Sequence, residues 1–312
     1  MNFTLKQLRY VEAAGRLQSI ARAAEEMNIS QSSITAAIDT LEQSLDYDIF
    51  IRTPAKGIQA TPSGVETLKL IRSFLDQSRH FESEVKSLGS GATGLVRIAV
   101  YGTAAPSLLP PIFDTITREF PGISIKLLEG HMGRLLEFLA NGEADLAFIY
   151  KEVIDDRYDF EPLFSAPVFA IISRNDPLSE KDSVTLAELA GQPMVMLDLP
   201  WAREYFLNLF ESKGLTCTIA HTTRSSDICR TLVSSGFGYS ILNILPLEQR
   251  AHDAQYRSIP ISDARNAPVF GIATSAGTRQ PKTVRAFIKS CLRLRSEGAF
   301  DAITIKVPYP FH

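Results

Sequence analysis

The chain has 312 residues, 45% of them hydrophobic and 21% charged, and a formal net charge of −3. This length favours two or three domains, the composition is typical of globular proteins, and the charge excludes a uniformly basic surface for nucleic acid. The apolar runs are too short to span a bilayer, and the first residues lack the pattern of a signal peptide. The three cysteines, Cys217, Cys229 and Cys291, are too far apart to indicate a disulfide framework or a metal site. We therefore expect a cytoplasmic protein that has no membrane segment and needs no metal or other cofactor.

The N-terminal residues show the periodicity of three short helices around a tight turn. Apolar residues recur every three or four positions, which is the spacing of one helix face. They are Leu5, Leu8, Tyr10 and Val11, then Ile20, Ala23, Ala24 and Met27, then Ile34, Ala37, Ile38, Leu41 and Leu45. Only Asn28, Ile29 and Ser30 separate the last two sets. Asparagine tolerates a left-handed backbone and serine is a common helix N-cap, so this arrangement predicts a helix-turn-helix.

The last of these helices carries short polar residues on its outward face near its start. They are Gln31, Ser32, Ser33 and Thr35. Such side chains can enter the major groove of DNA and contact base edges or phosphates. Helix pairs with close alanine contacts and serine-rich first turns also serve ordinary packing and capping, so this stretch alone leaves both interpretations open.

A β-hairpin is expected directly after the helices. Residues 48–53 are a β-prone run, residues 54–57 form a turn, and residues 58–61 return. Arg52, Thr53 and Lys56 lie near the tip of this wing, where cationic side chains can neutralise phosphates or reach the minor groove.

A long helix follows, capped by Thr61-Pro62-Ser63-Gly64. Its apolar positions step by three and four residues, close to coiled-coil periodicity. They are Val65, Leu68, Ile71, Leu75, Phe81, Val85 and Leu88, with Ser78 interrupting the series. A single helix needs a partner to cover such a stripe, and a second subunit is the simplest partner.

These motifs together resemble the LysR-type transcriptional regulators. The matching residues are Leu8-Arg9-Tyr10, Ala23-Ala24, Ser30-Gln31-Ser32-Ser33-Ile34-Thr35, Ile38, Leu41-Glu42, Leu45, Phe50, Arg52 and Thr61-Pro62-Ser63-Gly64. The resemblance continues to about residue 298. It implies a winged helix-turn-helix, a dimerising linker helix and a two-lobed effector domain like periplasmic binding proteins. It also implies a homodimer or homotetramer, a double-stranded DNA operator and a small-molecule effector.

The N-terminal module departs from the family's pattern. Residues 36–37 are Ala-Ala where the family often has Arg or Gln, and Asn28 stands where a glycine-like turn-former is common. Residues 1–60 contain six Lys and Arg against seven Asp and Glu, a net charge of −1. One such module makes few phosphate contacts, so we expect several linked modules to supply affinity through their effective concentration.

The remaining residues alternate between strand and helix patterns, which indicates an α/β fold. The expected organisation is a DNA-binding domain at 1–61, a linker helix at 62–88, a hinge at 89–94, an effector domain at 95–298 and a tail at 299–312. The effector domain divides into lobe I, about 95–162 and 266–298, and lobe II, about 163–265. Two crossings between the lobes predict a hinged cleft. The proline-rich tail is either disordered or packed on a neighbouring subunit.

Loops after strands and before helices are the expected effector site, because ligands of open α/β sheets bind beyond the carboxyl ends of strands. Helix N-termini there favour an anion, for example a carboxylate. The candidate residues are Thr103, Ala104, His131, Met132, Phe164, Trp201, Arg203, Ser225 and Ser226. The loops at Thr103 and His131 match those that the resemblance implies for effectors.

Ordinary structural roles are the alternative for these residues. Thr103, Ser225 and Ser226 also suit helix caps, Trp201 suits the core of its lobe, and Arg203 suits a surface ion pair. A solute-binding protein with an added dimerisation segment and an enzyme that uses the cleft are the rival functions. No nucleophile paired with a base appears in the loops, so no catalytic residues are assigned.

Overall fold

The computed structural model describes residues 3–53, 57–86, 92–247 and 255–307. The chain divides into two compact units, Met1–Lys86 and Ser87–His312. Each unit has its own hydrophobic core. In the described part of the chain, no helix is long and apolar enough to cross a membrane.

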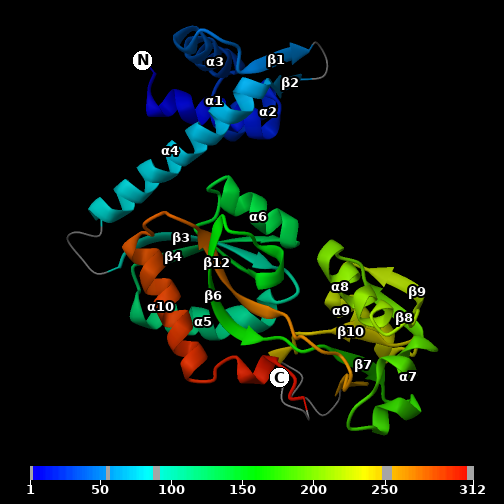
Figure 1. The fold of residues 1–312 in the computed structure, drawn as a ribbon. Coiled ribbons are helices and arrows are strands. Elements are labelled where there is room, and N and C mark those ends of the chain that lie inside the picture. The colour runs from blue at the N-terminus through cyan, green and yellow to red at the C-terminus, as the bar shows by residue number, and fades with distance from the viewer. Residues whose placement is uncertain (1–2, 54–56, 87–91, 248–254, 308–312) are drawn as a thin grey trace. The chain divides into compact units, whose positions relative to one another are not determined.

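The N-terminal unit is the predicted helix-turn-helix. It consists of α1 (Leu5–Leu17), α2 (Ile20–Glu26), α3 (Gln31–Leu45), β1 (Phe50–Thr53), β2 (Gly57–Ala60) and α4 (Pro62–Lys86) (Figure 1). Asn28 has φ 52° between α2 and α3, the left-handed backbone that the turn requires. Ser30 caps α3, since its side chain accepts a hydrogen bond from the backbone N–H of Ser33. Both features confirm the sequence prediction.

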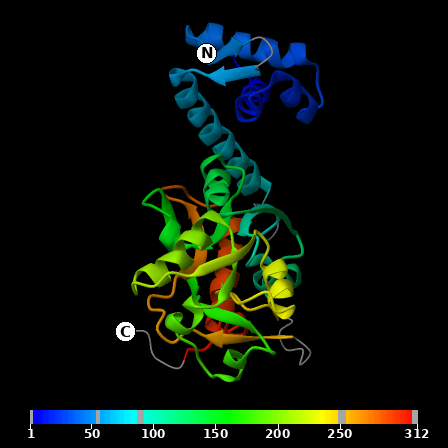
Figure 2. The same ribbon diagram turned by 90° about the vertical axis from the view of Figure 1, so that its right-hand side faces the viewer.

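The two strands form the predicted wing. β1 and β2 pair antiparallel, with Phe50 opposite Ala60 and Thr53 opposite Gly57 (Figure 2). The tip of the hairpin, residues 54–56, lies outside the described residues, and so does the predicted DNA contact Lys56. Thr61 then caps α4 by accepting from the N–H of Gly64 at 2.8 Å. A Cβ on Gly64 would lie 2.0 Å from the carbonyl oxygen of Ile49, so only glycine fits where α4 passes the start of the wing.

The apolar stripe of α4 is divided between two environments, which corrects the prediction of a single partner-facing seam. Leu68, Ile71 and Leu75 are buried in the core of their own unit. Leu70, Phe74, Phe81 and Val85 form a second, exposed face of the same helix, and Val65 is exposed as well. The first turns of α4 pack on α1 of the same chain, so a second subunit is not needed to cover those positions.

Lobe I of the second unit is built on a five-stranded sheet in the order β4-β3-β5-β12-β6. β3, β4 and β5 are parallel, and β12 runs antiparallel to both β5 and β6. Helices α5 and α10 lie on one face of the sheet and α6 lies on the other (Figure 1). The strands are β3 (Gly94–Tyr101), β4 (Ile123–Gly130), β5 (Leu146–Tyr150), β6 (Tyr158–Ser165) and β12 (Val269–Ser275). The helices are α5 (Ala105–Glu119), α6 (Met132–Ala140) and α10 (Lys282–Ser296).

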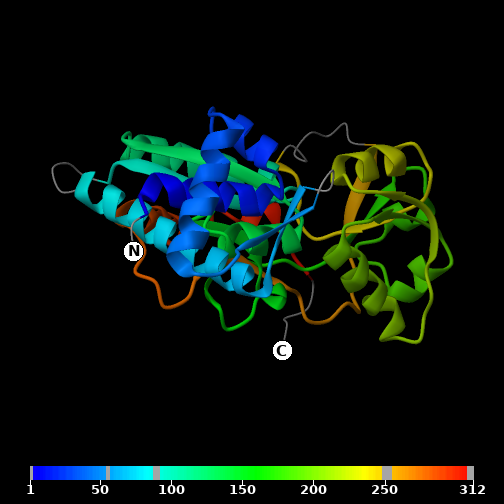
Figure 3. The same ribbon diagram turned by 90° about the horizontal axis from the view of Figure 1, so that it is seen from above.

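Lobe II has its own strands and helices (Figure 3). β7 lies between β10 and β11 in antiparallel pairing, and β8 and β9 pair parallel. A bridge between Met194 and Tyr239 joins β8 to the start of β10. The elements are β7 (Phe169–Ser173), α7 (Leu186–Ala190), β8 (Pro193–Leu197), α8 (Pro200–Glu211), β9 (Thr218–Thr223), α9 (Ser226–Ser234), β10 (Ser240–Leu242) and β11 (Tyr256–Pro260). Short 3-10 helices cover Lys151–Val153, Pro177–Glu180 and Asp301–Ile303.

The start of the C-terminal tail packs on its own chain, which corrects both sequence alternatives for the described part of it. Phe300 and Ile303 are buried in the core of the second unit. The backbone N–H of Leu245 donates to the carbonyl of Ile303 at 2.8 Å. Residues 308–312, which include most of the proline-rich end, lie outside the described residues.

Candidate functional site

The predicted DNA-reading residues lie at the start of α3. Gln31, Ser32 and Ser33 are exposed, and Thr35 is half-buried. The hydroxyl of Ser30 lies 2.8 Å from the Ser32 hydroxyl and 2.9 Å from the Ser33 hydroxyl. The cap residue therefore orients both serines as well as closing the helix, a role that the sequence alone did not indicate.

Arg52 on the wing is paired within the unit. Its guanidinium donates a hydrogen bond to Asp39 of α3 and lies 3.5 Å from a carboxylate oxygen of Glu42. The hydrogen bond with Asp39 raises the pKa of Arg52. Glu42 also accepts from the backbone N–H groups of Ile49 and Phe50, at 2.8 and 3.0 Å. This network fastens the wing to the recognition helix.

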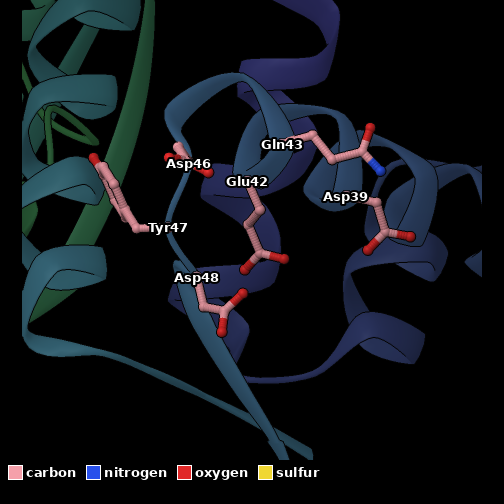
Figure 4. Close-up of a pocket in the computed structure, with 6 residues that line it drawn as sticks. All are labelled: Asp39, Glu42, Gln43, Asp46, Tyr47 and Asp48. Carbon is pink, nitrogen blue, oxygen red and sulfur yellow. The ribbon is translucent and has the colours of Figure 1, made fainter.

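An acidic hollow lies beside this network, at the C-terminal half of α3 (Figure 4). Its lining residues are Asp39, Glu42, Gln43, Asp46, Tyr47 and Asp48. The Tyr47 hydroxyl lies 2.8 Å from that of Thr67 on α4. Four carboxylates make this hollow unfavourable for a phosphate backbone, whereas the N-terminal turn of α3 is free of acids.

In the second unit, the predicted effector loops follow the carboxyl ends of strands in both lobes. β3, β4 and β5 end at Tyr101, Gly130 and Tyr150 in lobe I, and α5 and α6 begin just after the first two. In lobe II, α8 and α9 begin after β8 and β9, whose ends are joined by a 2.7 Å hydrogen bond from the Asp198 N–H to the Thr223 carbonyl. Such edges are where α/β sheets bind ligands.

Stacked aromatic rings join the two lobes at this place. Trp201 at the start of α8 stacks on Tyr150 with a centroid distance of 4.4 Å and an interplanar angle of 18°. Its other neighbour is Tyr205, at 5.1 Å and 5°. Tyr101 meets Tyr150 edge-on at 6.1 Å. Trp201 therefore belongs to the junction between the lobes as well as to the core of lobe II.

Three polar atoms are buried at this junction: the hydroxyls of Tyr101 and Tyr150 and the amide nitrogen of Asn243. Burial raises the pKa of Tyr101 to about 12, and a polar contact with Thr103 lowers it in part. Burial also raises the pKa of Tyr150 well above its usual value, against a smaller lowering by the nearby Asn243 amide. Both phenols are therefore protonated hydrogen-bond donors at neutral pH.

Several predicted effector residues have the ordinary structural roles that were their alternatives. Arg203 forms an ion pair with Asp198 at 2.9 Å, and Ser225 caps α9. The hydroxyl of Ser226 accepts from the guanidinium of Arg230 at 3.3 Å. The side chains of Ala104 and Met132 are buried in the core.

The other candidates lie at different places around the junction. His131 is half-buried at the N-cap of α6 and makes no side-chain capping bond. Phe164 stacks on Phe270, and Phe270 meets Tyr150 edge-on. Tyr101, Tyr150 and Asn243 were missed because each follows or ends an apolar run and looks like ordinary core. Among the described residues, no group of three or more His, Cys, Asp or Glu is arranged to hold a metal ion.

A winged helix-turn-helix, followed by a long helix and a two-lobed α/β domain, defines a class of DNA-binding regulators with an effector domain. Two family models match the chain: "Bacterial regulatory helix-turn-helix protein, lysR family" over residues 5–65 and "LysR substrate binding domain" over residues 89–295. The chain belongs to the LysR family of transcriptional regulators.

Curated relatives and solved structures agree with this assignment. The chain is 26% identical to the uncharacterized HTH-type transcriptional regulator YybE of Bacillus subtilis, over 87% of this chain and 92% of the relative. It is 27% identical to the HTH-type transcriptional regulator CysB of Burkholderia cenocepacia, over 94% and 93%. The crystal structure of HinK, a LysR family transcriptional regulator from Pseudomonas aeruginosa, matches with a TM-score of 0.60 and 28% identity, over 95% and 98% of the two chains.

Proposed function

We propose that this regulator reads its operator with the first turn of α3 and senses a small metabolite where the two lobes meet. The main observation in support of DNA reading is that Gln31, Ser32 and Ser33 are exposed beside a cap that orients the two serines. Gln31 is the base-reading residue, because its amide can form a bidentate pair with adenine. Ser32, Ser33 and Thr35 contact base edges or phosphates.

The wing supplies the backbone contacts in this proposal. Arg52, Thr53 and Lys56 approach phosphates or the minor groove, with Arg52 held at a fixed angle by Asp39 and Glu42. The unit's acidic hollow keeps DNA on the N-terminal side of α3. Affinity then rests on several linked units, in a homodimer or homotetramer.

The effector-binding part of the proposal rests on the junction between the lobes, where stacked rings and buried polar groups coincide. Thr103, His131, Phe164 and Trp201 are the proposed effector contacts. A ligand that favours one lobe arrangement shifts the population of that arrangement and so the placement of the DNA-binding units. The protein regulates and does not turn its ligand over.

The proposed DNA reading by α3 is tested by operator selection followed by binding titrations with the full chain. We expect Gln31→Ala to lower the discrimination against wrong bases by about 1–3 kcal/mol at one position of the site. Gln43→Ala is the matched control: it makes the same change on α3, but Gln43 lines the acidic hollow. An operator profile that is unchanged in Gln31→Ala, or changed equally in both variants, would remove Gln31 from the reading face.

A further inference from the structure

The outward face of α10 carries a row of cations that the proposed function does not use. The 15 residues of this helix include five lysines and arginines and no aspartate or glutamate. We propose that this face of the effector domain binds the phosphate backbone of the DNA that the N-terminal unit holds. The inference is independent of which bases α3 reads.

The cations form one stripe along the helix. Its four members are all exposed: Lys282, Arg285, Lys289 and Arg293. Steps of three and four residues place them on one side of α10, while Phe287 and Cys291 on the other side are buried in the core of the second unit. At about 1.5 Å per residue the stripe is about 16 Å long. The phosphates of one DNA strand follow each other every ~3.4 Å along the helix axis, so the stripe spans about five of them.

The middle of the stripe keeps its charge. Arg285 donates to the carbonyl of Gln280 at 3.0 Å, and this acceptor is neutral. In the described part of the chain neither Arg285 nor Lys289 forms an ion pair. Arg293, in contrast, is paired with Glu119 and lies 3.6 Å from Glu297. The first turn of α10 contains no acid either. The free charge therefore lies toward the N-terminal half of the helix.

The start of α10 lies at the sheet edge where the chain enters the effector domain. The sheet begins with β3 at Gly94, and β3 runs parallel to β5. Because β12 is antiparallel to β5, its last residue, Ser275, lies at the edge where β3 and β5 begin. Helix α10 follows from Lys282 and contacts β3 (Figure 1). The stripe thus starts at the edge that is joined to the DNA-binding unit, whereas the predicted effector loops follow the opposite ends of the strands.

The N-terminal unit leaves a need for such a surface. Residues 1–60 contain six Lys and Arg against seven Asp and Glu. Three of the six form ion pairs within the unit: Arg9, Arg16 and Arg52. Each phosphate that a protein cation neutralises adds about 0.9 to the slope of log affinity against log salt. DNA is the polyanion that a regulator of this family binds, so it is the partner that fits a row of free cations.

The test is the salt dependence of DNA binding by the full-length protein. Fluorescence anisotropy with a labelled mixed-sequence duplex of about 60 base pairs, from about 50 to about 200 mM salt, gives the slope. We expect the double variant Arg285→Gln, Lys289→Gln to bind more weakly at low salt, with a slope smaller by about two units. Its loss of affinity over this salt range should then be about tenfold smaller than that of the wild type.

Two further double variants serve as controls. Lys151→Gln, Lys213→Gln removes two exposed lysines elsewhere on the effector domain and should keep the wild-type slope. Arg285→Lys, Lys289→Arg keeps both charges and exchanges the head groups, so it should also keep that slope. All the substituted side chains are exposed, so chemical denaturation should give wild-type stability for each variant.

Three results would overturn the proposal. An equal fall in slope for Lys151→Gln, Lys213→Gln would show that only the overall charge matters. A lower slope in the charge-preserving exchange would assign the effect to the hydrogen bond of Arg285. A wild-type slope together with weaker self-association in Arg285→Gln, Lys289→Gln would make the stripe a contact between subunits. Operator selection with this last variant should return the wild-type base preference, so failure of this inference and failure of base reading by α3 are distinguishable.

Discussion

At the scale of single residues, the ion pairs of Arg52 decide how much positive charge the wing presents to DNA. A net charge of −1 in residues 1–60 already predicts weak phosphate binding by one unit. The structure adds that Arg52 is neutralised locally by Asp39 and Glu42, while Glu42 also holds two backbone N–H groups of the wing. Arg52 therefore combines a structural role with its proposed DNA contact, and the two roles compete.

Asp39→Asn should free Arg52 from its ion pair and strengthen its proposed contact with DNA. The substitution removes the main partner of Arg52, while Glu42 still anchors the wing through Ile49 and Phe50. We expect tighter binding to all DNA sequences and a salt dependence steeper by about one unit in the log–log slope. Asp46→Asn is the control, since it removes a charge from the same hollow without releasing Arg52. Equal slopes for the two variants, measured by fluorescence anisotropy over a salt series, would show that release of Arg52 does not matter.

At the scale of elements, two edge strands, β6 and β11, lack the sequence pattern of a strand. Strand β6 contains Pro162 and has an irregular burial pattern, because it pairs only with β12 and meets a bulge at Phe270 and Gly271. β11 is likewise at a sheet edge and ends at Pro260. Proline is tolerated on edge strands, where one side needs no ladder bonds, so these segments lack the alternation of a half-buried strand.

The sequence predicted the candidate site only as a set of loops, because contacts between distant segments leave no local pattern. Helix starts after strands are visible in the sequence, and Thr103, His131 and Trp201 were found in this way. The contact of Trp201 with Tyr150 depends on how two lobes dock, and no local pattern encodes it. Tyr101 and Tyr150 end buried strands, where an aromatic residue ordinarily indicates core.

Helix α4 has one face buried in the core of its unit and another face exposed to solvent. Leu75 is 5% exposed in the core of its unit, whereas Phe81 is 70% exposed. Leu75→Ala should lower the free energy of unfolding by about 2–5 kcal/mol through loss of burial and the cavity left behind. Phe81→Ala should leave that stability nearly unchanged and weaken self-association, because an exposed aromatic on an apolar face is a natural subunit contact.

Sedimentation equilibrium and chemical denaturation at one fixed protein concentration distinguish the two effects. Fixed concentration is needed because association itself adds to apparent stability. Wild-type self-association in Phe81→Ala would place the subunit interface elsewhere.

At the scale of the whole effector domain, the C-terminal segment is connected to the junction between the lobes through aromatic rings. Phe300 packs on Phe164 at 5.6 Å, Phe164 on Phe270 at 5.4 Å, and Phe270 on Tyr150 at 4.8 Å. The backbone of Leu245, which follows β10, is held from both sides. Its N–H donates to Ile303, and its carbonyl accepts from the Ser107 hydroxyl of α5 at 2.8 Å. The segment thus links lobe I to the stretch of lobe II that follows β10.

Phe300→Ala tests whether this segment belongs to the domain's core. Phe300 is 2% exposed, so the substitution should lower the free energy of unfolding by about 3–5 kcal/mol. It should also raise the mobility of Trp201, because the ring chain that ends at Tyr150 loses its outer support. Thr304→Ala is the control within the same segment, since its hydroxyl donates to the carbonyl of Asp301 in an exposed position. Denaturation followed by both circular dichroism and Trp201 anisotropy separates stability from local order. A Phe300→Ala protein as stable as Thr304→Ala, with unchanged anisotropy, would mean that the segment lies on the domain without supporting it.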